Sequence, residues 1–222
     1  MRSPFFGYRR MAAVLNRLGH RVNEKRILRL MRLMGLQAVY PKPNLSMSKE
    51  VKKRYPYLLS GIKIEKRDQV WSSDITFIPL KKGFLYLVAV LDWYSRYCLS
   101  WELSNTLEEG FCLDALERAL KYSRPTIFNT DQGSQFTGNS FTNVLEYAGI
   151  QISWDGKGRA LDNVFIERVW RSLKYEDIYP KQYENALEAS QGISKYFEFY
   201  NKHRPHQSLG YATPFEVYCG RC

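Results

Sequence analysis

The stretch QVWSSDITFIPL, residues 69–80, is where the chain changes from a helical pattern to a strand pattern. Apolar and polar side chains alternate along it, which predicts a strand with Trp71 and Ile75 on one face and Asp74 on the other. A carboxylate in the middle of a strand is costly to bury unless it is paired or binds a metal ion. Asp74 is therefore the first candidate functional residue.

The elements after this strand indicate the fold class. GFLYLVAVLDWY has the pattern of a buried strand, and RYCLSWELS has the pattern of a third one. The rest alternates between helices, over 107–123, 138–149, 162–176 and about 184–202, and strands, over 126–131 and 150–155. Three strands followed by alternating helices and strands predict an α/β domain with a mixed sheet flanked by helices.

Two further carboxylates could join Asp74 at one edge of this sheet. Asp131 lies where a predicted strand ends, and Glu167 lies on a predicted helix. Ligands collect at strand ends in open α/β sheets, and hard divalent cations such as Mg²⁺ prefer oxygen ligands. The 35 residues between Asp131 and Glu167 are weak evidence alone, because 22 acids in 222 residues make chance spacings common.

The helix predicted for DNVFIERVWRSLKYE, residues 162–176, has one broad apolar face. Glu167, Arg171 and Lys174 share a stripe beside that face, because they are four and three residues apart. One interpretation is a surface Glu–Arg pair worth about 0.2–0.5 kcal/mol. The other is a catalytic carboxylate with basic residues that hold a phosphate chain.

The positive charge of the chain is concentrated at one end. Residues 1–68 contain 17 lysines and arginines but four acids, whereas residues 69–222 carry slightly more acids than bases. Charge segregated in this way indicates a polyanionic partner, most often nucleic acid. Within this region, two short helical patterns around Gly19, with Asn23 as a possible N-cap, fit a helix-turn-helix or a plain helical hairpin.

Cysteine use and hydropathy favour a soluble cytoplasmic protein. Cys98, Cys112, Cys219 and Cys222 have no disulfide-framework spacing, and the run FLYLVAVL is far too short to span a bilayer. His203 and His206, followed by Cys219 and Cys222, have the ligand types of a zinc site. Packing or DNA contact is the competing interpretation for the two histidines.

Several motifs together resemble the bacterial insertion-sequence transposases, specifically the second-frame product of the group whose full enzyme is made by frameshifting. The matching stretches of the core are WSSDITFI, LDWYSR, NTDQGSQFT, LDNVFIERVWRSLKYE and FYNKHRPHQSLGYATPFE. GYRRMAAVLNRLGHRVNEKRILRLMRLMGL resembles the helix-turn-helix region that precedes this core. The resemblance covers nearly the whole chain and implies a ribonuclease-H-like, retroviral-integrase-like catalytic core of the DDE type.

The resemblance implies a catalytic, metal-binding triad of Asp74, Asp131 and Glu167, with two Mg²⁺ or Mn²⁺ ions. It also implies DNA contact by Lys174, to which we add three candidate contacts: Arg171, Arg204 and His206. The expected partners are double-stranded DNA at the element ends and target, further copies of the chain on DNA, and a first-frame DNA-binding protein. The expected location is the bacterial cytoplasm, at the nucleoid.

The resemblance also gives the expected domain organisation. We expect a helix-turn-helix-like basic region (1–36), a basic linker (37–68), an integrase catalytic core (69–180), and a C-terminal helix and tail that pack on the core (181–222). The expected reaction is 3′-end cleavage and strand transfer. Two alternatives remain: a ribonuclease-H-like nuclease, and an inactive or truncated relative that only binds DNA, since similar second-frame products have more residues before this start.

Overall fold

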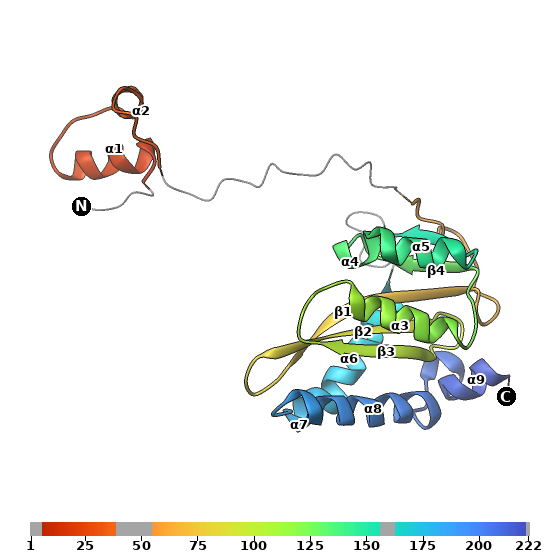
Figure 1. The fold of residues 1–222 in the computed structure, drawn as a ribbon. Helices are drawn as coiled ribbons and strands as arrows, with labels where there is room; N and C mark the ends of the chain where they lie inside the picture. Colours follow the sequence, from red (N-terminus) through yellow and green to blue (C-terminus); the bar gives the residue numbers. More distant parts are fainter. Residues whose placement is uncertain (1–5, 39–54, 156–162, 221–222) are drawn as a thin grey trace. The chain divides into compact units, whose positions relative to one another are not determined.

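The structure, a computed structural model, describes residues 6–38, 55–155 and 163–220 (Figure 1). The chain divides into two compact units, Met1–Val51 and Lys52–Cys222. Each unit is described by itself. None of the helices in the described ranges is long and apolar enough to cross a membrane.

The first unit contains α1 (Tyr8–Arg17) and α2 (Glu24–Leu33). The side chain of Asn23 accepts a hydrogen bond from the backbone N–H of Lys25, which confirms the expected N-cap. Asn16 closes the turn between the helices, because its side chain both donates to and accepts from the backbone of Val22. Ala12 and Ile27 are the buried residues of the two helices, so this hairpin has a very small core of its own.

A five-stranded mixed sheet forms the centre of the second unit. Its strands are β1 (Val70–Pro79), β2 (Phe84–Asp92), β3 (Cys98–Ser104), β4 (Ile127–Thr130) and β5 (Gln151–Trp154). The strand order is β3-β2-β1-β4-β5, with β1, β2 and β3 antiparallel and with β4 parallel to both β1 and β5. The predicted α/β class and mixed sheet are confirmed.

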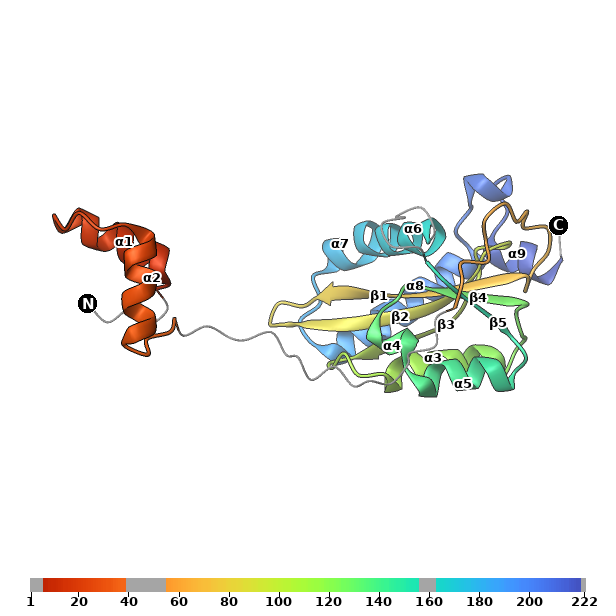
Figure 2. The same cartoon turned by 90° about the horizontal axis from the view of Figure 1, so that it is seen from above.

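Helices cover both faces of the sheet (Figure 2). On one face, α3 (Gly110–Leu120) and α5 (Asn139–Tyr147) pack with Trp71 and Phe128 in one apolar cluster. On the other face, α6 (Val164–Leu173) and α8 (Ala186–Lys202) pack with Ile78 and Leu87 in a second cluster. The remaining short elements are α4 (Ser134–Thr137), α7 (Tyr179–Lys181), α9 (Pro214–Cys219), and a 3₁₀ turn, η2 (Gln207–Leu209).

Residues 55–68, the described part of the range expected to be a linker, pack on this second unit. Leu59 is buried in a small cluster with Val70 and Trp93. The side chain of Asp68 accepts hydrogen bonds from Trp71 Nε1 and Tyr218 Oη, so this segment also holds the C-terminal tail. Structurally, these residues belong with the core.

The helix that carries Glu167 changes character at its C-terminal end. After α6, one turn of π-helix, η1 (Lys174–Ile178), replaces the α-helix that the sequence predicts there. The buried carboxylate of Asp177 anchors this turn by accepting from Lys181 Nζ and Tyr183 Oη. Gly192 makes room for Tyr183, because a Cβ at Gly192 would lie 1.8 Å from the tyrosine oxygen.

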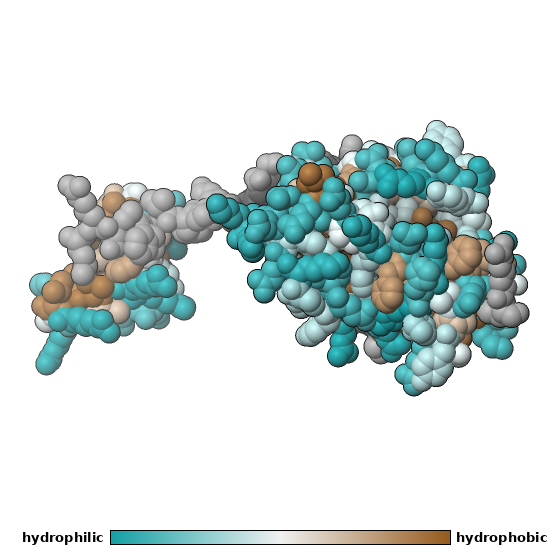
Figure 3. Space-filling model, turned by 90° about the horizontal axis from the view of Figure 1, so that it is seen from below, coloured by the Kyte–Doolittle hydropathy of each residue, from teal (hydrophilic) through white to brown (hydrophobic). Residues whose placement is uncertain are grey.

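The surface of the second unit is largely hydrophilic on the face that Figure 3 shows, with isolated apolar side chains. On the first unit, apolar side chains gather together in the same view. The exposed large apolar residues of that unit are Leu18, Leu33, Met34 and Leu36.

Candidate active site

Strand register brings Asp74 and Asp131 to the same level of the sheet. In the parallel pair β1–β4, Val70 lies beside Ile127 and Ser72 beside Asn129. The same register, continued by two residues, places Asp74 beside Asp131, which directly follows β4, and neighbouring strands lie about 4.7–4.9 Å apart. Alternation puts Asp74 on the same face as Ile78, which packs against α6 and α8.

Asp74 is largely buried and interacts electrostatically with both of the other candidate acids. Its Oδ2 accepts a hydrogen bond of 2.9 Å from Trp170 Nε1 on α6. Burial raises the pKa of Asp74 to about 6, the hydrogen bond from Trp170 opposes this rise, and repulsion from Asp131 and Glu167 adds to it. Asp74, Asp131 and Glu167 therefore share one electrostatic neighbourhood, as the predicted triad requires.

The three carboxylates are not gathered around a common point in this structure. Within the ranges that the structure describes, no group of three or more His, Cys, Asp or Glu side chains is placed to hold a metal ion. Asp131 and Glu167 are both exposed, so rotation of their side chains would not disturb the core. A shared metal site requires such a rotation toward Asp74.

Asp131 is held by the turn that follows it. Its Oδ1 accepts a hydrogen bond of 2.9 Å from the backbone N–H of Gly133. The φ of Gly133, −62°, is ordinary for any residue, so the turn does not require a glycine for its backbone conformation. The constraint is instead one of space, because a Cβ at Gly133 would lie 2.9 Å from Asp131 Oδ1.

Gly133→Ala is therefore expected to displace the carboxylate of Asp131 by a fraction of an ångström or more, and to slow a reaction that depends on this carboxylate by about 10–100-fold. The melting temperature is expected to stay nearly unchanged, since the turn is exposed. Gly110→Ala is the matched control, because a Cβ there meets nothing within 4 Å. Equal reaction rates for the two variants would show that the space at Gly133 is not needed to place the carboxylate of Asp131.

The basic residues of the predicted stripe divide between two places. Lys174 interacts electrostatically with Asp74. Burial lowers the pKa of Lys174, and the attraction of the Asp74 carboxylate partly offsets that lowering. Arg171 instead lines a neighbouring basic pocket together with Arg168. Of the three candidate acids, Asp74 is the one that interacts electrostatically with Lys174, while Arg171 adds its positive charge to the pocket.

A fourth acid, Asp155, lies beside the predicted triad. Thr130 pairs with Trp154 in the parallel strands β4 and β5, so Asp131 and Asp155 follow their strands at the same level. Asn129 Nδ2 donates to Asp155 Oδ1 at 2.7 Å, which ties the ends of the two strands together. We did not single out Asp155 from the sequence, although an acid directly after the last predicted strand was a usable signal.

Asp92 has a structural role. Its fully buried carboxylate accepts hydrogen bonds from the backbone N–H groups of Ser95 and Asp68 and forms no salt bridge with Arg96. The guanidinium of Arg96 lies over the ring of Phe165 instead, 3.5 Å from its centroid. The backbone of Arg96 is in the left-handed region, with a φ of +64°.

Arg204 and His206 are both tied into the C-terminal tail. Arg204 Nε and Nη2 donate to the carboxylate of Glu176 at 2.9 and 2.6 Å. His206 is buried against the ring of Tyr200, and burial together with the positive charge of Arg204 and Arg96 lowers its pKa to about 4. It is therefore neutral at pH 7. Of the four residues with the ligand types of a zinc site, Cys222 lies outside the described residues.

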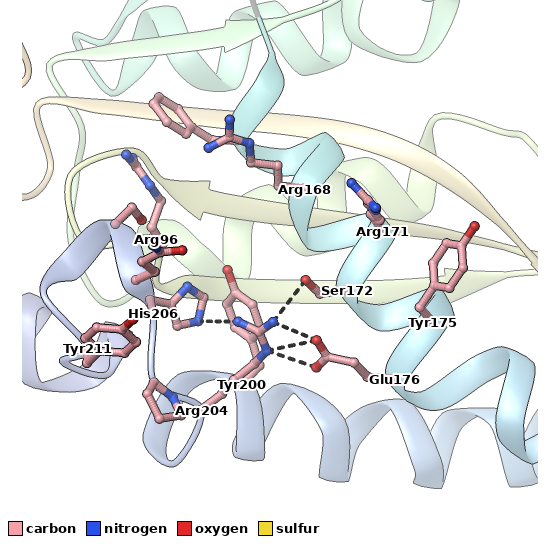
Figure 4. A pocket seen from close by; sticks show the side chains of 14 residues that line it. Arg96, Arg168, Arg171, Ser172, Tyr175, Glu176, Tyr200, Arg204, His206 and Tyr211 are labelled. Carbon is pink, nitrogen blue, oxygen red and sulfur yellow. Dashed lines mark hydrogen bonds and ion pairs between the residues drawn. The ribbon is translucent and has the colours of Figure 1, made fainter.

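A pocket with a volume of about 810 Å³ lies between α6, η1 and the tail, and none of the three candidate acids lines it (Figure 4). Its basic side chains come from three parts of the chain, and aromatic rings alternate with them. The residues that line it and carry charge or a ring are Arg96, Phe165, Arg168, Arg171, Tyr175, Glu176, Tyr200, Arg204, His206 and Tyr211.

Comparison with protein families and curated proteins identifies the chain. The integrase core domain matches residues 65–160 and, in a second form, residues 148–214, and an HTH-like domain matches residues 1–44. The transposase for insertion sequence element IS904 of Lactococcus lactis subsp. lactis (strain IL1403) is 35% identical, over 96% of this chain and 88% of its own length. The chain belongs to the insertion-sequence transposases.

Other transposases and viral integrases agree with this assignment. The transposase for IS629 of Shigella sonnei is 31% identical, over 96% of this chain and 73% of its own length. The HTLV-2 integrase catalytic core domain in complex with magnesium has a TM-score of 0.55 at 18% identity, over 70% of this chain and 99% of that one. At this identity the likeness shows the fold alone, and that fold is the ribonuclease-H-like one predicted for this transposase.

Proposed function

We propose that this transposase cuts the 3′ ends of an insertion element and joins them to target DNA, with Asp74, Asp131 and Glu167 as the ligands of divalent metal. Family membership gives the transposase and polynucleotidyl transferase activity. The observation that carries the finer proposal is the environment of Asp74. Its carboxylate is partly buried and is repelled by those of Asp131 and Glu167, and both effects raise its pKa. Such a group of acids is stabilised by a cation.

The side chains of the site suit Mg²⁺ or Mn²⁺, because both metals prefer carboxylate oxygens. We propose two ions per site. Bound metal of this kind activates an attacking water or 3′-hydroxyl and stabilises the leaving oxygen. Trp170 positions the carboxylate of Asp74 through its Nε1–H, and the backbone N–H of Gly133 holds the carboxylate of Asp131 in the metal-free protein. Lys174, beside Asp74, would attract the phosphate that reacts.

The proposed partners are the DNA of the element ends and of the target. The HTH-like region and its arginines provide a second DNA-binding element, which suits the charge of residues 1–68. We also propose that further copies of this chain assemble on DNA and that a first-frame protein contributes to recognition of the ends. A simian T-cell lymphotropic virus intasome has a TM-score of 0.61 to this chain at 13% identity.

The domain division that we propose keeps the helix-turn-helix-like region at 1–36 and a basic linker after it. The catalytic unit then includes residues 55–68, since Leu59 and Asp68 pack on the sheet and the tail. Residues 181–222 complete that unit, with the ring of Tyr218 stacked on that of Tyr97 at 4.8 Å between centroids.

Incubation of the full chain with a labelled duplex that carries the terminal repeats, with Mg²⁺ or with chelator, tests this function. We expect nicked ends and joined products in Mg²⁺ and neither in chelator. Nicking without joining would indicate a nuclease, and a shifted band without nicking would indicate a protein that only binds DNA. Either outcome would overturn the proposal.

A further inference from the structure

The pocket between α6, η1 and the tail contains two arginines that no acid of the described residues neutralises. Its one carboxylate, Glu176, is already held by Arg204 through two hydrogen bonds and by Tyr196 Oη. Arg168 and Arg171 are exposed, and neither forms an ion pair with any residue that the structure describes. These two side chains are therefore available to bind an anion from outside the chain.

Arg96 adds a third guanidinium from another part of the chain. It is half-buried, and burial together with repulsion from Arg168 lowers its pKa to about 10, so it remains charged at pH 7. Two like charges held near each other in a partly buried place are unfavourable unless an anion lies between them. A phosphate is the anion that the planar, multiply donating guanidinium groups bind best.

Aromatic rings at the pocket supply a surface of a second kind. Tyr211 and Tyr175 line the pocket, and each is 69% exposed. Tyr211 has a φ of +69°, a conformation that costs a non-glycine residue about 1–3 kcal/mol. Its backbone N–H donates to the carbonyl of His206 at 2.9 Å, which holds the ring at the pocket. Exposed rings beside arginines are the arrangement that binds unpaired bases.

The position of the pocket relates it to the reacting strand. Arg171 follows Glu167 by one helical turn, about 6 Å along the axis of α6. Arg168 of α6 and Tyr175 of η1 line the pocket together with Arg171 (Figure 4). Trp170 of α6 contacts Asp74 instead and does not line the pocket. A strand whose phosphate lies at the acids can therefore continue across Arg171 into the pocket.

We propose that this pocket binds an unpaired nucleotide next to the cut site, with its base stacked on Tyr211 and its phosphate held by Arg168, Arg171 and Arg96. A pocket of about 810 Å³ is of the size that takes a small-molecule ligand, whereas a double helix is too wide to enter it. The base must therefore leave the duplex, as bases do in other enzymes that act on extruded nucleotides. This inference rests on the proposed function, because it takes the acids as the cut site.

Arg204 and His206 are positioning residues of the pocket in this account. Arg204 joins the tail to η1 through Glu176 and Ser172, and the neutral His206 packs on Tyr200. Both were candidate DNA contacts from the sequence. Here they shape the wall that presents Tyr211, while Arg168 and Arg96 supply the charge.

The test uses the full chain in chelator, so that no cleavage occurs. Two duplexes are compared, one fully paired and one with a single unpaired 2-aminopurine beside the cleavage position. We expect roughly tenfold tighter binding of the second duplex, since stacking of one base contributes about 1–3 kcal/mol. We also expect the fluorescence of 2-aminopurine to fall on binding, because the base stacks on a tyrosine.

Variants test which residues produce the preference for the unpaired nucleotide. Tyr211→Leu and Arg168→Gln are expected to lose the preference for the unpaired nucleotide, and Tyr211→Phe is expected to keep it. Tyr147→Leu, an exposed tyrosine on α5, and Arg124→Gln, an exposed arginine before β4, are the matched controls. Arg168→Gln lies on the exposed face of α6 and keeps the test valid even if Tyr211→Leu does not fold.

The outcomes separate this inference from the proposed function. No preference in the parent protein, or an unchanged preference in Arg168→Gln or in folded Tyr211→Leu, would overturn the pocket assignment. A preference that persists while the parent shows no Mg²⁺-dependent cleavage would support the pocket and reject the cleavage activity. Cleavage without any preference for the unpaired nucleotide would support the cleavage activity and reject the pocket assignment.

Discussion

Asp131→Asn is expected to reduce Mg²⁺-dependent cleavage of the element ends by roughly a thousand-fold or more, the size of loss that follows removal of a group central to transition-state stabilisation. Asparagine has nearly the shape of aspartate and keeps an oxygen that can accept from Gly133 N–H. It lacks the negative charge that a metal ligand at this position supplies. The measurement is the rate of nicking of a labelled end duplex in Mg²⁺.

DNA binding and folding are expected to be unchanged in Asp131→Asn, because the side chain is exposed and donates nothing to the core. Asp114→Asn is the matched control, since Asp114 is exposed on α3, which covers the other face of the sheet. Nicking by Asp131→Asn at the parental rate would reject the assignment of the acid. Equal losses in both variants would show that the effect is one of net charge.

The sequence predicts the sheet and the acids because both depend on local patterns. Alternation in residues 69–80 identifies β1 and shows that Asp74 is a carboxylate in the middle of a strand. Each later strand pattern ends in a turn or an acid. The parallel register of β1 and β4, which brings Asp74 and Asp131 to one level, comes from the structure and was not predicted. For these elements the local preference and the tertiary structure agree.

Three features could not be predicted because tertiary contacts decide them. The π-helical turn after α6 depends on Asp177, which is held by Tyr183, and Tyr183 needs the space at Gly192. The pairing of Arg204 with Glu176 joins residues that are 28 positions apart. No spacing rule relates such positions, so the sequence gives no sign that Arg204, a candidate DNA contact, also links the tail to η1.

Asp74→Asn is expected to stabilise the metal-free protein at pH 8 while it abolishes cleavage. The pKa of Asp74 is about 6 in the folded chain against an ordinary value of 3.8, because burial and two neighbouring acids disfavour its ionised form. The stability that this group contributes is fully present below about pH 4 and is lost as pH rises through about 6. Two pKa units correspond to at most about 3 kcal/mol.

Thermal unfolding in chelator measures this effect as a function of pH. The variant is expected to melt about 6–12 °C above the parent at pH 8 at most, and at nearly the same temperature near pH 4. Asparagine can still accept from Trp170 Nε1, so the contact with α6 remains. Mg²⁺ should raise the melting temperature of the parent at pH 8 and have less effect on the variant, because metal relieves the repulsion that the substitution has already removed. A parent that is insensitive to both pH and Mg²⁺ would show that Asp74 is not held among uncompensated acids.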